Sequence, residues 1–249
     1  AEASDGEQIR ELTRKSMDAL HEQRLFRMLL AKKAGGEELP LPVYCRVIEA
    51  IARYDGSAAW CVGQGSGCSM LSAYLDAGIS SKIWGKNDNG VLAWGPGKSE
   101  ARAVEGGYLV TAKTMFVSGS HHATWLATHC STVYETDGSI RKAKNGKPEI
   151  LTTFIPASET TLSDNWYVFG LRNTGSDGFE LNEHFVPEKH TIVRATMIEG
   201  TEDISTLYNF SMMAIYAMGF ASVALGIGTA FLDKFLDIAQ NKKPRNADD

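Results

Sequence analysis

The 249-residue sequence lacks the features of a metal-binding or disulfide-bonded scaffold. Its four cysteines include no Cys-x-x-Cys pair, so we expect neither a zinc ribbon nor a disulfide framework. A reducing, cytoplasmic location follows from that expectation. His121, His122 and His129 have no carboxylate or cysteine at a familiar ligand spacing, so we expect no metal site.

The chain also lacks a surplus of positive charge, and its first residues do not have the pattern of a signal peptide. Its 25 Lys and Arg residues are outnumbered by 30 Asp and Glu residues, and the formal net charge of −5 argues against a general nucleic-acid binder. Residues 1–15 are polar and charged, so no signal peptide is expected. A hydrophobic content of 43% is too high for a disordered chain and predicts one large or two modest globular domains.

One segment, residues 209–232, contains no charged residue and is long enough to cross a bilayer. Its many small residues favour a buried helix in a helical bundle instead. Its charged neighbours, Glu202, Asp203 and Asp233, are acidic, whereas basic residues usually flank a transmembrane helix. We therefore expect no membrane association.

The first third of the sequence has the apolar spacing of helices. Apolar residues recur at helical intervals across residues 9–33, and a Gly-Gly pair ends the pattern. Pro40 and Pro42 open a second helix, because the first turn of a helix tolerates a missing N–H group. Ser57 is positioned to cap a third helix, and residues 79–84 are expected to form a short helical turn.

After residue 85 the apolar spacing changes to the alternation that is typical of strands. Gly106 and Gly107 form an expected hairpin turn, and residues 205–240 return to helical spacing. Helices, then an antiparallel β region, then one helix predict an α+β fold rather than alternating β-α-β units. The expected strands are residues 91–94, 101–104, 108–112, 115–117, 125–134, 149–155 and 178–185.

These spacings divide the chain into three expected parts. Residues 1–86 form an N-terminal helical domain, residues 87–200 a β domain, and residues 201–249 contain a single long helix. A long helix of small residues cannot bury its apolar face alone, so it needs partner helices. We therefore expect that the chain is a fragment, or that its partner helices come from another subunit.

Four motifs occur in order along most of the chain. They are the helix start Asp55-Gly56-Ser57-Ala58-Ala59-Trp60, the run GGYLVTAKTMFVSGSHHATWL from Gly106 to Leu126, the run GLRNTGS from Gly170 to Ser176, and Phe185-Val186-Pro187. In this order the motifs resemble those of the acyl-CoA dehydrogenase superfamily. Within it, they are most similar to the branch of two-component flavin-dependent monooxygenases.

The resemblance implies a fold, an assembly and an activity. The fold has an N-terminal helical domain, a middle antiparallel β-barrel and a C-terminal four-helix bundle, of which only the first helix is present here. The usual assembly is a homotetramer formed through that bundle. The activity is that of an oxygenase component. A partner flavin reductase supplies reduced FMN or FAD, and O2 oxygenates a small organic substrate through a C4a-hydroperoxide of the flavin.

The resemblance also implies a flavin site. Ser118 is the expected catalytic residue, with its hydroxyl or its backbone at flavin N5. Phe116 and Ser118 are expected on one face of a strand whose backbone, including Val117, meets the ring edge. Trp94 and Gly95 occupy the strand end where dehydrogenases of the superfamily carry a flavin loop. Without the resemblance, these residues are equally typical of a turn and a half-buried aromatic side chain.

A second group of residues is expected to contact a phosphate or the substrate. Phenol hydroxylases of this branch carry a histidine on the third N-terminal helix that helps to deprotonate the phenol. This chain has no histidine at that place, so oxygenation of sulfur or nitrogen stays open. Apart from the resemblance, the group is typical of a solvated turn and core packing. The group comprises Trp166, Arg172, Thr174, Ser176, Cys68 and Ser69.

Two alternatives to the oxygenase stay open. One is an FAD-dependent acyl-CoA dehydrogenase, which would pass electrons to an electron-transfer flavoprotein. The other is an inactive, truncated scaffold that binds no flavin. Because residues of the bundle close the site in this family, we expect the fragment alone to lack activity.

Overall fold

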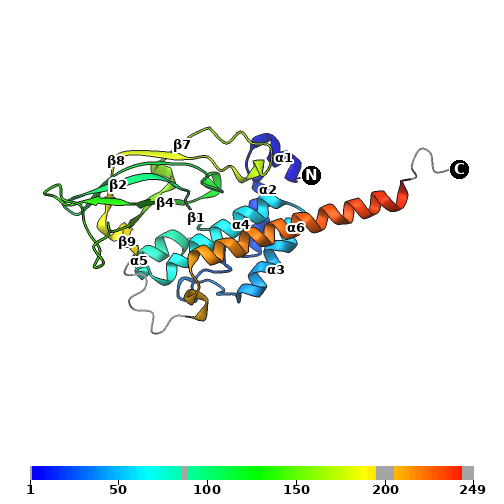
Figure 1. Ribbon diagram of the computed structural model, residues 1–249, viewed down its shortest axis with the longest axis horizontal. Helices are drawn as coiled ribbons and strands as arrows, with labels where there is room; N and C mark the ends of the chain where they lie inside the picture. Colours follow the sequence, from blue (N-terminus) through cyan, green and yellow to red (C-terminus); the bar gives the residue numbers. More distant parts are fainter. Residues whose placement is uncertain (1, 86–88, 195–204, 243–249) are drawn as a thin grey trace.

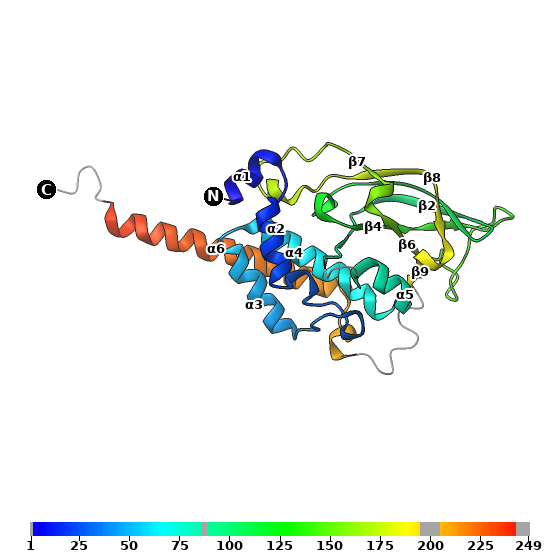
Figure 2. The same ribbon diagram turned by 180° about the vertical axis from the view of Figure 1, so that it is seen from behind.

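The computed structural model describes residues 2–85, 89–194 and 205–242, and it places a β layer beside a layer of helices (Figure 1). The long C-terminal helix α6 (Met212–Asn241) lies along the helical layer and then extends beyond it (Figures 1 and 2). The α+β class is confirmed. The expected domain boundaries, at residues 86–87 and 200–201, lie outside the described residues.

The N-terminal segment forms two helices, so the prediction of one helix over residues 9–33 is wrong. Helix α1 (Glu2–Ile9) ends at Arg10, which has a positive φ of 61° that a helix does not allow. Helix α2 (Arg14–Glu22) then starts after Thr13, whose side chain accepts a hydrogen bond from the backbone N–H of Ser16. Short helical turns follow α2 instead of a continued helix.

Helices α3 (Leu41–Ala52) and α4 (Gly56–Ser69) are the centre of the helical layer. Helix α3 begins directly after Pro40, as predicted. The predicted cap of α4 is wrong by two residues, because the Asp55 carboxylate, and not Ser57, accepts the backbone N–H of Ala58 at 3.0 Å. The small residues of α4 let it pack closely: a Cβ added at Gly67 would lie 2.6 Å from the ring of Tyr216 in α6.

The remaining helical pieces are short and connect the larger elements. Helix α5 (Ala77–Ser80) and the π turn η4 (Ser81–Gly85) confirm the expected helical turn after α4. The 3-10 turns are η1 (Leu25–Arg27), η2 (Lys32–Ala34), η3 (Met70–Ala73), η6 (Ser120–His122), η7 (Ala157–Glu159), η8 (Arg172–Thr174), η9 (Glu188–His190) and η11 (Thr206–Asn209).

The β layer consists of two sheets that share one hydrophobic core. The four-stranded sheet has the order β1 (Leu92–Ala93), β4 (Trp125–Cys130), β6 (Leu151–Pro156), β9 (Thr191–Val193). The five-stranded sheet has the order β5 (Thr132–Tyr134), β2 (Gly97–Val104), β3 (Gly107–Thr114), β8 (Phe179–Pro187), β7 (Thr161–Leu162). Every second side chain of a strand points to the same face of its sheet. Tyr108, Val110 and Ala112 of β3 are therefore all buried in the core between the two sheets.

Three details of the β prediction are wrong. The strands form two sheets that are not wholly antiparallel, because β1 pairs with β4 and β2 pairs with β5 in parallel. The expected strand over residues 125–134 is divided between the two sheets. Residues 115–117 are not a strand, because β3 ends at Thr114 and Phe116 adopts a positive φ of 55°.

The two halves of α6 differ in their surroundings. Ser211 caps the helix, and Ile215 and Val223 are buried against the helical layer, mainly α3 and α4. Residues 231–240 are all exposed, including several large apolar side chains. By length and composition, residues 212–240 could also cross a membrane. One face of the first half is therefore buried, and the bundle itself stays a prediction.

Candidate active site

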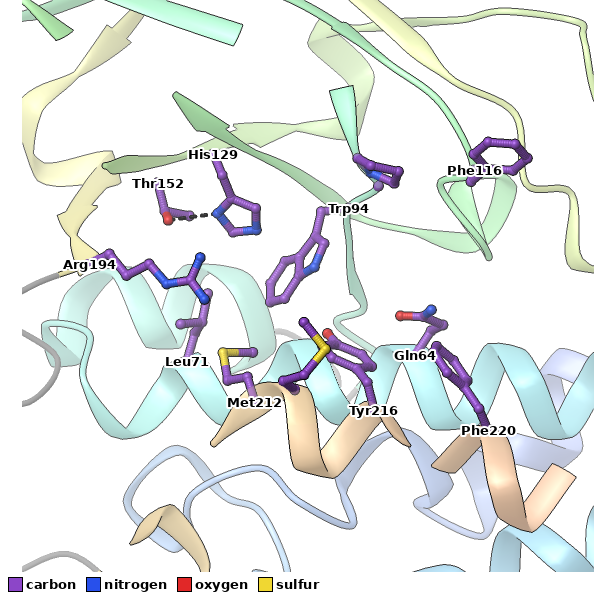
Figure 3. A pocket seen from close by; sticks show the side chains of 13 residues that line it. Gln64, Leu71, Trp94, Phe116, His129, Thr152, Arg194, Met212, Tyr216 and Phe220 are labelled. Carbon is purple, nitrogen blue, oxygen red and sulfur yellow. Dashed lines mark hydrogen bonds between the residues drawn. The ribbon is translucent and has the colours of Figure 1, made fainter. Parts of the chain in front are cut away.

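A cavity of about 330 Å³ lies between the β layer and helices α4 and α6 (Figure 3). Most of its lining is apolar, and the polar side chains that reach it are few. In Figure 3, Gln64 lies beside Phe220, on the same side of Trp94 as Phe116, whereas His129 and Arg194 lie on the other side. The volume and the mixture of apolar walls with a few polar groups are typical of a site for a small molecule.

A row of aromatic rings runs along the cavity. Tyr216 and Phe220 lie one turn apart on α6, and their ring centroids are 6.0 Å apart. Phe220 stacks on Trp60 of α4 at 4.2 Å. At the other end of the row, the Trp94 ring makes edge contacts with Tyr216 at 6.3 Å and with His129 at 5.0 Å. The row therefore joins the helical layer to the β layer across the cavity.

Phe116 lines the cavity from the loop after β3. Its positive φ is costly for a residue with a Cβ, and 55% of its surface is nevertheless exposed. The ring has an edge contact with Trp166 at 5.9 Å between centroids. The backbone N–H of Met115 donates to Pro96 at 2.9 Å, which joins this loop to the Trp94 segment. Strained and exposed aromatic residues of this kind are typical of functional sites.

A chain of hydroxyl groups lies behind Phe116. The Trp60 Nε1–H group donates to Ser118 Oγ at 3.0 Å, and Ser118 Oγ lies 2.8 Å from Ser176 Oγ. Ser176 Oγ lies 2.7 Å from Thr174 Oγ1, which donates to the carbonyl of Leu171 at 2.8 Å. An indole N–H can only donate, so Ser118 accepts from Trp60 and keeps its own proton for Ser176 or another acceptor.

Comparisons with known proteins agree with this arrangement. No protein-family model matches the chain. The oxygenase component of p-hydroxyphenylacetate 3-hydroxylase from Acinetobacter baumannii is 26% identical over 247 residues, which are 96% of this chain and 56% of that protein. Indole-3-acetate monooxygenase from Pseudomonas putida is 26% identical over 236 residues, 94% of this chain and 57% of that protein.

Solved structures match along almost the whole chain. XiaF from Streptomyces sp., in complex with FADH2 and glycerol, has a TM-score of 0.87 at 24% identity, over 99% of this chain and 62% of XiaF. The HsaA monooxygenase from M. tuberculosis has a TM-score of 0.84 at 23% identity, over 99% of this chain and 64% of HsaA. This chain has the fold of the flavin-dependent monooxygenase oxygenase components. The resemblance inferred from the four motifs is confirmed, and the chain spans little more than half the length of these curated relatives.

The structure places the residues predicted for a monooxygenase flavin site in two layers. Trp94, Gly95 and Phe116 line the cavity. Val117 is fully buried in the core of the β layer, and Ser118 lies in the hydroxyl chain, with its backbone N–H donating to the carbonyl of Phe116 at 3.0 Å. Phe116 and Ser118 therefore do not share a strand face. The expectation was wrong on that point because the left-handed residue turns the loop between them.

The predicted phosphate or substrate residues of the 166–176 segment are separated in the same way. Trp166 contacts Phe116, and its backbone N–H donates to the Asp177 carboxylate at 2.8 Å. Thr174 and Ser176 are buried in the hydroxyl chain. Arg172 is exposed, and within residues 2–85, 89–194 and 205–242 its guanidinium has no hydrogen bond or ion pair.

Cys68 and Ser69, on α4, lie behind the cavity and not in its lining. Cys68 Sγ lies 3.4 Å from Tyr216 Oη, and the ring of Tyr216 lines the cavity. Burial raises the pKa of the Cys68 thiol to about 12, so the thiol is neutral at physiological pH. Ser69 Oγ donates to the carbonyl of Ser66 at 2.7 Å. Cys68 thus supports the aromatic row, and Ser69 supports α4 itself.

Several residues that line the cavity are not predicted from the sequence. Tyr216 and Phe220 are four residues apart in an apolar helix, a spacing that signals a shared face but no particular ligand. His129 was considered only as a metal ligand. Its partner Thr152 and its neighbour Arg194 come from β6 and from the end of β9, so no local spacing signals them.

Proposed function

We propose that this chain belongs to the oxygenase component of a two-component monooxygenase, which uses reduced flavin and O2 to oxygenate a small organic substrate. The observation that carries the proposal is that the cavity lies where the motifs predict a flavin, at Trp94, Gly95 and Phe116. The names of the relatives support it, since two of them are a hydroxylase oxygenase component and a monooxygenase.

The residues at this end of the cavity fit a flat, largely apolar ring. Trp94 and Phe116 supply aromatic walls. Gly95 is required where it lies, because a Cβ there would be 2.0 Å from the carbonyl oxygen of Met115 and would push the Phe116 loop away. We propose that Trp94, Gly95, Phe116 and Val117 hold reduced FMN or FAD by these walls and the intervening backbone. The flavin would supply the electrons that activate O2, through the C4a-hydroperoxide that the resemblance implies.

We propose that Ser118 is the catalytic hydrogen-bond donor beside the flavin. Trp60 can only donate, so the indole fixes the Ser118 oxygen as an acceptor and leaves the Ser118 proton to be given away. Ser176 takes that position in the present structure. When Ser118 donates to a bound ring, Ser176 can donate to Ser118 if Thr174 turns its proton from the Leu171 carbonyl to Ser176.

The remaining parts of the proposal concern domains and partners. We propose the division into residues 1–86, 87–200 and 201–249, in line with the separate helical and β layers. The exposed second half of α6 would pack against further helices of the bundle and, through them, form a homotetramer. A separate flavin reductase would supply the reduced flavin in the cytoplasm, since p-hydroxyphenylacetate 3-hydroxylase is described by its oxygenase component.

The test is the rate at which protein-bound reduced flavin is reoxidised by O2. The longest available form of the chain is loaded anaerobically with reduced FMN or FAD and mixed rapidly with oxygenated buffer, and the return of oxidised-flavin absorbance is recorded. We expect a delay relative to free flavin, because the site excludes water and Ser118 donates to the bound ring. Ser118→Ala should shorten the delay about tenfold or more, whereas the exposed-site control Ser158→Ala should leave it unchanged.

The other outcomes identify the alternatives. Reoxidation as fast as that of free flavin would contradict the oxygenase. Tightly bound oxidised FAD that an acyl-CoA reduces would identify a dehydrogenase. If the full chain binds neither oxidised nor reduced flavin, the scaffold is the correct description.

A further inference from the structure

The end of the cavity opposite Phe116 carries a positive charge that has no ion-pair partner among the described residues. Arg194 follows β9, and its backbone N–H donates to the carbonyl of Ile150 at 3.0 Å, which anchors the residue to the sheet. Its guanidinium lies at the cavity beside Leu71 and Met212 (Figure 3). Among the residues that the structure describes, no carboxylate or other acceptor bonds to this guanidinium.

His129 adds a second hydrogen-bond donor at the same end. Its Nδ1 lies 2.8 Å from Thr152 Oγ1, and Thr152 is 2% exposed. In the tautomer in which the Thr152 hydroxyl donates to Nδ1, the imidazole proton lies on Nε2. Among the described residues Nε2 has no hydrogen-bond partner, so in this tautomer its proton is available to a ligand. Burial, and then the charge of Arg194, lower the pKa of His129 to about 4, so the ring is neutral at pH 7.

Two donors, one of them cationic, thus lie at one end of a cavity whose other walls are apolar and aromatic. Trp94 and Tyr216 offer ring surfaces beside them. A guanidinium in such surroundings is stabilised by an anionic oxygen that it can bind with two parallel hydrogen bonds. One cation and one neutral donor match a single negative charge. A ring bearing a carboxylate satisfies the donors and the apolar walls together.

We propose that Arg194 and His129 bind the carboxylate of an aromatic acid, and that an aromatic carboxylic acid is the substrate class of this cavity. That the bound acid is a substrate rests on the proposed function, whereas the binding of the acid does not require flavin. Arg194 acts as the specificity-determining residue, and His129 positions the second carboxylate oxygen.

The test compares an acid with a neutral compound of nearly the same shape. Binding of 4-hydroxyphenylacetate and of its methyl ester to the full chain is measured by calorimetry without flavin. We expect the acid to bind at least about tenfold more tightly, as one charge-assisted hydrogen bond provides. Arg194→Gln should reduce this ratio to about one, and Arg194→Lys should retain part of it. Arg46→Gln is the control, because Arg46 is exposed on α3 and does not line the cavity.

Several results would overturn the inference. They are equal affinities for acid and ester in the unsubstituted protein, no binding of either at millimolar concentration, or an unchanged ratio in Arg194→Gln. A fourth is a loss of FMN or inorganic phosphate binding in Arg194→Gln with the acid unaffected, which would assign the arginine to the flavin phosphate. Failure of the proposed function has a different signature, since reoxidation without delay would leave an Arg194-dependent preference for the acid intact.

Discussion

The two ends of the cavity are built in different ways. The Phe116 end consists of two short loops, one around Trp94 and one around Phe116. Within each loop the residues are consecutive in the sequence. The Arg194 end collects side chains from β4, β6 and the end of β9, facing the start of α6. One end is held by a strained backbone, and the other is held by strand pairing and a neutral histidine. The first therefore leaves a motif in the sequence, and the second does not.

This difference indicates how the two ends can vary. Phe116 has a left-handed backbone conformation, which persists only when the neighbouring residues hold it in place. We therefore expect this loop motif to tolerate few substitutions. Side chains presented by paired strands can change one at a time while the backbone stays in place. We therefore expect the Phe116 end to carry the common chemistry and the Arg194 end to carry the choice of substrate.

The largest effect is expected from removing the Tyr216 ring, which lines the cavity between its two ends. Tyr216→Ala deletes the ring between Trp94 and Phe220, and the cost should be about 3 kcal/mol of the free energy of unfolding. Ligand binding at both ends should weaken together. Urea denaturation and binding titrations check the two effects.

Tyr216→Phe is the control for this change. It keeps the ring and removes only the hydroxyl contact with Cys68, so it should cost about 1 kcal/mol or less. If Tyr216→Ala weakened binding at one end only, the Tyr216 ring would not support both ends of the cavity.

A second prediction sharpens the comparison through pH. The folded-state pKa of His129 is about 4 and its ordinary value is 6.5, so the unfolded chain binds the proton more readily. The free energy of unfolding should therefore fall as the pH decreases from about 6.5 to 4, and the full contribution should be present above pH 6.5. His129→Gln should show a shallower fall in urea denaturation at pH 5 and 7.

The control for this slope lies within the protein. His122 also has a pKa lowered to about 4, chiefly by burial and also by the positive charges of His121 and His21. It accepts the backbone N–H of Leu12 at 3.1 Å, away from the cavity, and stays present in both proteins. An identical slope with and without His129 would show that the Arg194 end does not hold a neutral imidazole.

The smallest expected effect tests the strain at the Phe116 end. Phe116→Gly and Phe116→Ala both remove the ring, but only glycine adopts the positive φ without a Cβ clash. The glycine variant should be more stable than the alanine variant by about 1 kcal/mol, measured by urea denaturation. Equal stabilities would mean that the loop rearranges and that the two ends do not differ in strain.

Most elements of the fold could be predicted from local spacing, and the errors have local physical causes. The end of α1 at Arg10 is set by a left-handed residue that docks beside Gly175, which apolar periodicity does not reveal. Asp55 and Ser57 are both good capping residues, and the three-dimensional start of α4 selects Asp55. The division of residues 125–134 between two sheets depends on pairing with distant strands.

The candidate site could be predicted only where a motif covers it. Trp94, Gly95 and Phe116 line the cavity, and their contacts with flavin, like the roles of Ser118 and Arg172, stay predictions. The connection of Trp60 to Ser118 spans 58 residues, and no spacing rule signals it. Arg194 and His129 meet through strand pairing, so topology is required to find them.

Gly226 gives α6 a further property. A Cβ at this position would lie 2.3 Å from the carbonyl oxygen of Glu49, so the two helix backbones touch where α6 begins to leave the helical layer. Beyond it, Arg53 and Asp233 form an ion pair at 2.6 Å. The contact lies about 15 Å along the helix from Tyr216. A partner that packs against the exposed arm of α6 would therefore act on the same helix that carries Tyr216 and Phe220 into the cavity lining.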